Sequence, residues 1–228
     1  MAWMAPDKAV EPLSLLVRRE STAEQVAGAL RGLIIDGALS PGTHLREGPL
    51  SQQLGVSRNT VREALHILVG QGVVRREIHR GAYVAELDAE DVRDIFRVRR
   101  LVELAAVREL IAVGQDLGAL ERALAELVDA VQAGRGTDEV LDADLRFHQT
   151  LVELVHSDRL GALYTSMSTE MSVCLTLSTG VEVHGDRLIR ELRALLTAMR
   201  KGDAEKAVAV LLQHLAAGER RLLARFDA

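Results

Sequence analysis

Two polar residues in the middle of the chain, Asp144 and His148, have types and a spacing that suit metal binding or a buried ion pair. In a helix they lie one turn apart on the same face. Leu141, Leu151 and Val155 fall on that face too, so we expect it to be buried. Burying a carboxylate costs several kcal/mol unless it is paired or bound to a metal ion. Asp144 therefore needs a partner, and His148 is the first candidate.

Two more polar residues interrupt apolar stripes in the second half of the chain. His214 falls on the stripe that Leu211 and Leu222 define, and Arg99 falls on the apolar face of an earlier helix. Each has an ordinary explanation, because His214 fits a hydrogen-bonded core histidine and Arg99 fits an ion pair with Glu103 at i+4. Polar groups that point inward from three different helices predict instead a polar pocket inside a helical bundle.

The first half carries residues that suit contact with nucleic acid. Residues 57–80 contain only two acidic residues but five arginines, namely Arg58, Arg62, Arg75, Arg76 and Arg80. Arg58, Asn59 and Arg62 fall at the start of a predicted helix, opposite its apolar face, where a recognition helix contacts base edges and phosphates. Arg80 beside Gly81 predicts a tight, cationic hairpin tip for a neighbouring groove. A small α+β domain with a surface arginine cluster is the alternative.

The elements that must position these arginines follow from capping and turn signals. Ser21 and Glu24 form a capping box before the first helix, and Ser40-Pro41-Gly42 predicts a turn after it. A short helix around Pro49 ends at Gly55, and Ser57 caps a helix whose inner face is Val61, Leu65 and Leu68. Two apolar segments around His79-Arg80-Gly81 then predict a hairpin. This order is that of a winged helix-turn-helix.

The second half is predicted to be helical almost throughout. Breaks near Gly114, 133–136, 157–158, 180–185 and 201–203 separate about six amphipathic helices joined by short loops. The fold class is therefore mainly α, with an N-terminal winged helix-turn-helix and a C-terminal all-α antiparallel bundle. We predict a loose tail over residues 1–12, a DNA-binding domain over 13–85 and an effector-binding and dimerisation domain over 86–228.

Composition narrows the class of protein. The chain has 228 residues and a net charge of −5, with 48% hydrophobic residues that can form a core. The charge divides unevenly, because residues 1–85 carry ten basic and eight acidic residues and the remainder carries 18 and 25. The 3% of aromatic residues argues against a stacking platform for single strands. A lone cysteine, Cys174, and the lack of a long apolar run or secretory signal predict a cytoplasmic protein that does not enter a membrane.

The first half resembles the DNA-binding domain of GntR-type bacterial transcription regulators. The resemblance rests on Leu39–Gly42, on Leu54-Gly55-Val56-Ser57-Arg58-Asn59-Thr60-Val61-Arg62-Glu63-Ala64-Leu65 and on Arg80–Val84. Many members have Thr-Pro where this chain has Asn59-Thr60. The resemblance implies contact with double-stranded DNA through Arg58 and Arg62, assisted by Ser57, Asn59, Thr60, Arg80 and Gly81.

The second half resembles the FCD ligand-binding domain of the FadR-like branch, through Val98–Glu103, Asp144–His148 and Gln213–Leu215. In many relatives an Asp and three His hold a divalent metal ion that helps to bind a small carboxylate. Asp144, His148 and His214 occupy three of these positions, and Leu192 stands where the fourth His is expected. Three protein ligands can still hold Zn²⁺ or a harder ion, and His184 is the other nearby histidine. Arg99 is the candidate for the effector carboxylate.

Together these observations predict a dimeric, ligand-responsive transcription regulator. We expect it to be a repressor, because repression is the commoner outcome in the resembled family. Two recognition helices related by two-fold symmetry would bind a near-palindromic operator. The effector would change operator affinity by favouring one arrangement of the two domains. We do not expect an enzyme. The alternatives are a metal-free sensor of an acyl or fatty-acid effector, a pure interaction module, and a hydrolase whose metal ion Asp144, His148 and His214 hold.

Overall fold

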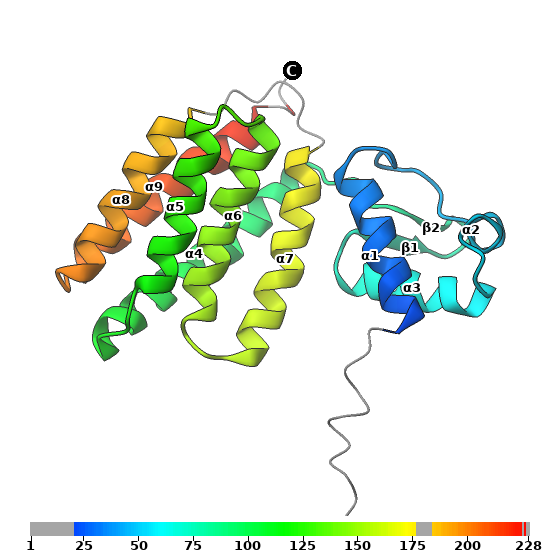
Figure 1. Cartoon of the computed structure of the whole chain (residues 1–228), viewed down its shortest axis with the longest axis horizontal. Coiled ribbons are helices and arrows are strands. Elements are labelled where there is room, and N and C mark those ends of the chain that lie inside the picture. The colour runs from blue at the N-terminus through cyan, green and yellow to red at the C-terminus, as the bar shows by residue number, and fades with distance from the viewer. Residues whose placement is uncertain (1–20, 177–183, 225, 227–228) are drawn as a thin grey trace, which may run out of the picture.

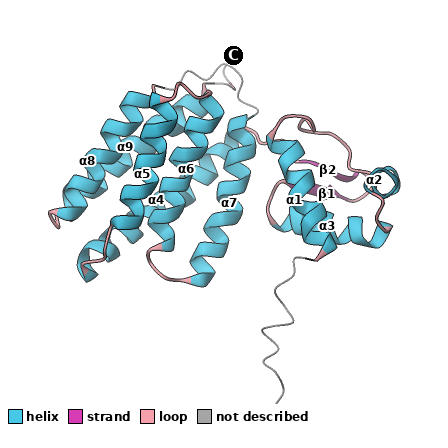
Figure 2. Cartoon of the chain, in the orientation of Figure 1, coloured by secondary structure: helices cyan, strands magenta, loops and turns pink. Residues whose placement is uncertain are grey.

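The structure, a computed structural model, describes residues 21–176, 184–224 and 226. The N-terminal segment 1–12, for which the sequence predicts a loose tail, lies outside the described residues. The described chain forms a small N-terminal unit with a two-stranded hairpin and a larger all-helical unit (Figures 1 and 2). This architecture confirms the predicted fold class. None of the described helices is long and apolar enough to span a lipid bilayer.

The N-terminal unit has the element order of a winged helix-turn-helix. Its elements are α1 (Thr22–Ile35), α2 (Glu47–Leu54), α3 (Arg58–Gly70), β1 (Val74–Glu77) and β2 (Gly81–Val84). The predicted capping box at Ser21 and Glu24 is present, and the Ser57 side chain accepts a hydrogen bond from the Thr60 amide. The hairpin is antiparallel, with Val74 opposite Val84. Local sequence signals therefore set the start of both major helices in this unit.

A compact apolar core joins these elements. Helix α1 packs on α3, and the apolar side of the hairpin covers the same core. Ile34, Val61, Leu68 and Val84 are fully buried there. Because the apolar residues of α3 face inward, its opposite face, which carries the arginines, is left exposed to solvent.

The helical unit is a bundle of six helices within the described residues, as predicted. They are α4 (Ala89–Val113), α5 (Gly118–Gln132), α6 (Thr137–Glu153), α7 (Asp158–Thr176), α8 (Gly185–Arg200) and α9 (Ala204–Leu223). Helix α4 packs along α9, α5 along α6, α6 along α7 and α8 along α9. Short connections at Gly114, Gly134 and Gly202 separate successive helices. The predicted boundary at residues 85 and 86 stays a prediction, although separate apolar cores lie on either side of it.

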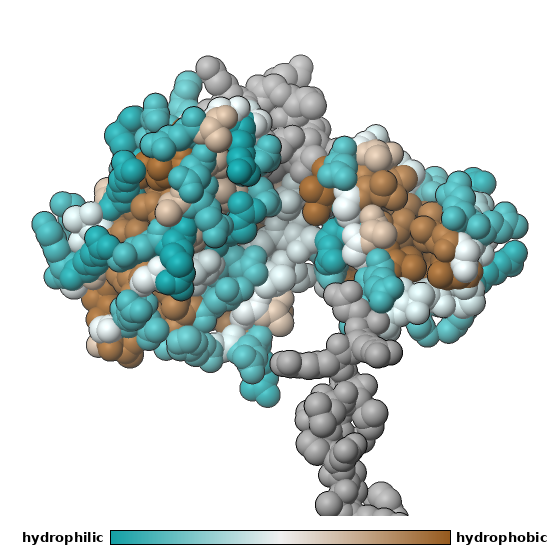
Figure 3. All heavy atoms as spheres, in the orientation of Figure 1, coloured by the Kyte–Doolittle hydropathy of each residue, from teal (hydrophilic) through white to brown (hydrophobic). Residues whose placement is uncertain are grey.

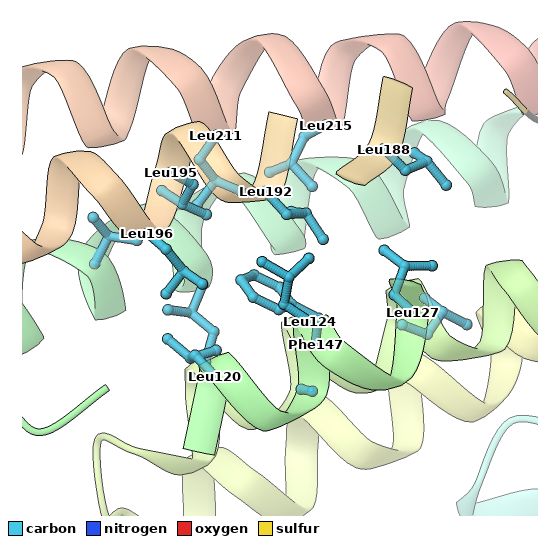
Figure 4. Packing of buried hydrophobic residues seen from close by; sticks show 14 of the residues in the cluster. Leu120, Leu124, Leu127, Phe147, Leu188, Leu192, Leu195, Leu196, Leu211 and Leu215 are labelled. Atoms are coloured by element: carbon cyan, nitrogen blue, oxygen red, sulfur yellow. The ribbon is translucent and has the colours of Figure 1, made fainter. Parts of the chain in front are cut away.

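Leucine side chains fill the centre of the bundle (Figure 4). Leu127 of α5, Phe147 of α6, Leu192 of α8 and Leu211 of α9 are all fully buried. The opposite faces of the helices are polar, and most of the visible face of the bundle is teal in Figure 3. Leu192 is thus an ordinary core residue, as its place in the apolar stripe predicts.

The two units touch through the first and the fourth helices of the bundle. In Figure 1, α7 (yellow) is the bundle helix that faces α1 and α3. The Ser166 hydroxyl of α7 donates a 3.0 Å hydrogen bond to the Gly70 carbonyl of α3. Arg75 of β1 donates to both carboxylate oxygens of Asp91 in α4, at 2.8 and 2.9 Å.

Leu127→Ala tests the bundle core. We expect the free energy of unfolding to fall by about 2–5 kcal/mol, because the change removes buried atoms and leaves a cavity. Urea denaturation followed by circular dichroism measures the loss. In the control, Leu163→Ala, the same atoms are removed from a side chain that is 72% exposed, and the loss should stay below about 1 kcal/mol. Similar losses in the two variants would contradict this core.

Candidate functional site

The start of α3 presents polar side chains to solvent. Arg58 and Asn59 are exposed in its first turn, beside the capping residue Ser57. Arg62, one turn later, donates to both carboxylate oxygens of Glu47 in α2, at 2.7 and 3.0 Å. The hydrogen bond from Arg62 lowers the pKa of Glu47. These residues are available on the outer face of the helix, as the sequence predicts, but Arg62 already has a partner there.

The hairpin supplies a second cationic group. Arg80 lies over the Tyr83 ring, 3.9 Å from its centre, and forms longer ion pairs with Glu77 and Glu86. Gly81, next to it, has φ +81°, a conformation that favours glycine and lets the chain turn sharply at the tip. Arg80 is thus held on the wing rather than extended freely into solvent.

An open groove of about 880 Å³ separates the wing from α2. A few apolar side chains line the groove. The charged and polar side chains of its lining include His44, Arg46, Glu47, Arg76 and Arg80. Arg76 belongs to the arginine cluster of residues 57–80, and the structure places it in this groove. A groove lined by Arg46 before α2 and by Arg76 and Arg80 of the hairpin can hold a phosphate backbone.

The bundle contains a buried polar site centred on the Glu103 carboxylate. One oxygen accepts hydrogen bonds from Arg99 Nε at 2.7 Å and from the Tyr164 hydroxyl at 2.6 Å. The other oxygen lies 2.6 Å from His148 Nδ1. All four side chains are buried, and they come from α4, α6 and α7. The Arg99–Glu103 pair that the sequence suggested is present, and it belongs to a larger network.

The three residues predicted to bind metal come together beside this network. The Nε2 atoms of His148 and His214 are 2.9 Å apart. The Asp144 oxygens lie 3.9 Å from His148 Nε2 and 3.6 Å from His214 Nε2. The ligand atoms of the three residues all lie within 4.8 Å of one another, and all three residues are buried. On the far side of His214, its Nδ1 lies 2.9 Å from a carboxylate oxygen of Glu191.

The charge states of the partners determine which ring nitrogens carry protons. Burial alone would raise the pKa of Glu103, but Arg99, His148 and two hydrogen bonds outweigh burial and lower it to about 2. The hydrogen bond from His214 lowers the pKa of Glu191 to about 2 as well. Burial lowers the pKa of His148 and favours its neutral form. Both carboxylates are therefore ionised at neutral pH and can only accept.

It follows that each histidine donates through Nδ1, and that neutral His148 turns the lone pair of its Nε2 toward the His214 ring. The two Nε2 atoms are 2.9 Å apart, so the lone pair of His148 Nε2 can accept a hydrogen bond from His214 or bind a cation beside the two rings. Carboxylates behind metal-binding histidines orient the ring in this way and increase the basicity of the ligand nitrogen. The arrangement of Asp144, His148 and His214 could therefore hold a divalent metal ion with open coordination positions.

A small cavity adjoins Asp144, one of the three residues. Its volume is about 30 Å³, and its lining includes Phe96, Arg99, Asp144, Met171 and Arg221. Two buried atoms at this place, Arg99 Nη2 and Asp144 Oδ1, have no hydrogen-bond partner. Unpaired buried polar atoms are uncommon in folded proteins and often mark a site for a ligand, an ion or water.

The structure also adds residues that the sequence analysis missed. Tyr164 and Glu191 complete the hydrogen bonds of the site, and Arg221 lines the cavity without a hydrogen bond or an ion pair to the described part of the chain. Arg221 lies seven residues after His214, which places it on the same face of the helix two turns later. This spacing in the sequence could have identified Arg221. His184, the alternative ligand, is exposed at the start of α8.

Two family descriptions match the chain. "Bacterial regulatory proteins, gntR family" matches residues 22–84, and "FCD domain" matches residues 94–217. The first range holds the arginines of α3 and the wing, and the second holds the buried polar site. The chain belongs to the GntR family of bacterial regulatory proteins. This GntR-family protein is a DNA-binding transcription regulator with a ligand-responsive helical domain, which confirms the predicted function class.

Proteins similar to this GntR-family chain are known from several bacteria. A structure described as a GntR transcriptional regulator from Rhodococcus sp. RHA1 has a TM-score of 0.78 and 32% identity, over 90% of this chain and 99% of that one. The gluconate operon transcriptional repressor of Bacillus subtilis is 28% identical, over 72% of this chain and 68% of its own length. The galactonate operon transcriptional repressor of Escherichia coli is 28% identical, over 83% of this chain and 91% of its own length.

Glu103→Gln tests whether the buried network holds the bundle together. The change keeps the shape of the side chain but leaves the buried Arg99 without a counter-ion, so we expect a loss of about 3–5 kcal/mol in the free energy of unfolding. Urea denaturation measures it. Asp94→Asn is the matched control, because Asp94 pairs with Arg97 at the surface, and it should cost less than about 1 kcal/mol. A loss that small in Glu103→Gln would show that the network carries little stability.

Proposed function

We propose that this GntR-family protein is a cytoplasmic homodimer that represses transcription from a near-palindromic operator and releases it in response to a small organic acid. The observation that carries the proposal is the presence, in one chain, of exposed arginines at the start of α3 and a cavity with unpaired charged atoms in the bundle. The first suits double-stranded DNA, and the second suits a ligand with oxygen atoms.

Arg58 and Arg62 are the main proposed contacts to DNA, with Ser57, Asn59, Thr60 and the wing residues Arg80 and Gly81 assisting. The ion pair between Arg62 and Glu47 is solvent-exposed, with the Arg62 side chain 49% accessible. Exposed pairs contribute only about 0–1 kcal/mol, so a phosphate or base edge can replace Glu47 as the partner of Arg62. A single module contacts few base pairs, and a second copy related by two-fold symmetry supplies the other half-site.

Arg58→Ala tests the DNA-binding surface. The variant should bind an operator fragment from the chain's own genome at least about tenfold more weakly at fixed salt, because a phosphate or base contact is lost. Fluorescence anisotropy measures the affinity. Arg97→Ala is the control, since Arg97 is also an exposed arginine but lies in α4, outside the proposed surface. The affinity of this variant should stay within about twofold of the original. Unchanged binding by Arg58→Ala would exclude this face of α3.

A divalent metal ion is the proposed cofactor, with Asp144, His148 and His214 as its ligands. The donor set fits Zn²⁺, which binds histidine nitrogen and carboxylate oxygen and accepts three protein ligands in open sites. The unpaired Oδ1 atom of Asp144 and the two facing Nε2 atoms support this fit. Bound there, the ion would supply positive charge to an effector carboxylate. Leu192, which stands where the resemblance to the FCD domain implies a fourth histidine, contributes no donor atom, so water or effector oxygens would complete the coordination.

Elemental analysis of protein purified without a His tag tests this cofactor. Wild type should contain about one equivalent of metal per chain, and His148→Ala should contain less than about a tenth, because structural and catalytic sites lose affinity steeply when a ligand is removed. His184→Ala is the control, because His184 is exposed at the start of α8, and its metal content should match wild type. Metal below about a tenth of an equivalent in wild type would end the proposal.

The proposed effector is a small organic acid that Arg99 binds. Its Nε atom is already bonded to Glu103, but its buried Nη2 atom has no partner and lies at the cavity. A guanidinium N–H in such a place suits a carboxylate, which is the reason to prefer an acid over a neutral ligand. The two repressors named above belong to the gluconate and galactonate operons, which supports a sugar acid. The unpaired charged atoms favour this acid over the fatty-acyl alternative.

A further inference from the structure

Helix α7 has two functional faces. Successive residues of a helix are rotated by about 100°, so Ser166, two positions after Tyr164, points to nearly the opposite side. Tyr164 faces the bundle, where its hydroxyl donates to the Glu103 carboxylate. Met171, seven positions after Tyr164, returns to the same inner side and lines the cavity. Ser166 and Glu170, one turn apart, form the outer face, toward the N-terminal unit.

The outer face of α7 contacts the end of the recognition helix. The Ser166 hydroxyl donates to the carbonyl of Gly70, the last residue of α3, which has no partner within its own helix. Two residues later, Gly72 has φ +72°, and the Glu170 side chain fills the space that a Cβ at Gly72 would need. The contact therefore lies at the junction between α3 and the first strand of the wing. Figure 1 shows α7 between the other bundle helices and this unit.

The cavity is too small for an organic acid as it stands. About 30 Å³ accommodates one or two water molecules. Its lining residues belong to α4, α6, α7 and α9. Of these, α4 and α9 pack closely along each other, and α6 packs against α5 and α7. Because Met171 is the contribution of α7, a ligand that enlarges the cavity presses directly on the helix that touches α3.

From these contacts we infer that α7 transmits the state of the buried site to the DNA-binding surface. Tyr164 receives the change at the buried site. Ser166 and Glu170 pass the resulting displacement of α7 to residues 70–72. A ligand that rearranges Arg99 or Glu103 alters the hydrogen bond to Tyr164 and displaces α7. The end of α3 and the start of the wing then move together. This route, which rests on the proposed function, would connect effector binding to operator affinity. Its first test needs neither DNA nor ligand.

Hydrogen exchange of the full chain provides that first test. Tyr164→Phe removes only the hydroxyl that binds Glu103, which lies on the inner side of α7. If α7 transmits the change, the segment 66–75, whose turn is closed by amides of Gln71, Gly72 and Val73, should exchange at least about threefold faster than in wild type. Exchange in α5, which packs on α6 and α8, provides the internal reference. Leu163→Ala, an adjacent exposed change on α7, should leave the segment 66–75 unaltered. Unaltered exchange in Tyr164→Phe overturns the inference.

A double-mutant cycle on operator affinity is the second test. Tyr164→Phe should change the dissociation constant of the operator complex by at least about threefold, and the effect should vanish when Ser166→Ala is also present, because both changes act on one route. Ser166→Thr keeps a hydroxyl and should restore the effect. An equal effect of Tyr164→Phe in both backgrounds overturns the inference and leaves α4, through Asp91 and Arg75, as the route. A wild-type chain that binds no operator contradicts the proposed function instead, and hydrogen exchange then decides the inference by itself.

Discussion

The Glu103 carboxylate, buried without access to water, is the constraint on which the helical unit depends. An isolated charge in such a place is strongly unfavourable, so the surrounding helices must supply donors. Arg99, His148 and Tyr164 do so from α4, α6 and α7. The bond from Arg99 lies within α4, whereas the bonds from His148 and Tyr164 also fix α6 and α7 relative to α4. Any ligand that competes for one of the donors therefore acts on the packing of the bundle.

The same carboxylate orients the His148 ring for the proposed binding of a metal ion. By accepting from Nδ1 it leaves the Nε2 lone pair directed at His214, whose ring Glu191 orients from the other side. Binding a cation at this place needs little rearrangement, because the protein has already paired the distal nitrogens. In this arrangement the two Nε2 atoms face each other at 2.9 Å, where a hydrogen bond between the rings or the proposed metal ion can be accommodated. Stability and ligand binding are thus coupled in one cluster of side chains.

In the N-terminal unit, unlike the bundle, the ion pairs are exposed to solvent. Its arginines lie at the surface, where their partners are Glu47, Glu77 and Glu86. Exposed pairs of this kind are weak and exchange readily for phosphate oxygens. Helix α7 lies between the buried network of the bundle and the N-terminal unit. One side of this helix bonds to Glu103 and the other to the end of α3.

Local signals in the sequence were sufficient for the elements and for the type of each unit. Caps at Ser21 and Ser57, glycine stops and apolar periodicity depend on residues within a turn or two of one another, so they can be seen without the fold. The polar residues Arg99, Asp144, His148 and His214 stood out for the same reason, since each interrupts an apolar stripe. Tyr164, Glu191 and the contact of Ser166 with Gly70 depended on how distant helices pack. Hydrogen bonds between residues 61 or 96 positions apart leave no periodic trace in the chain, and only the tertiary structure decided them.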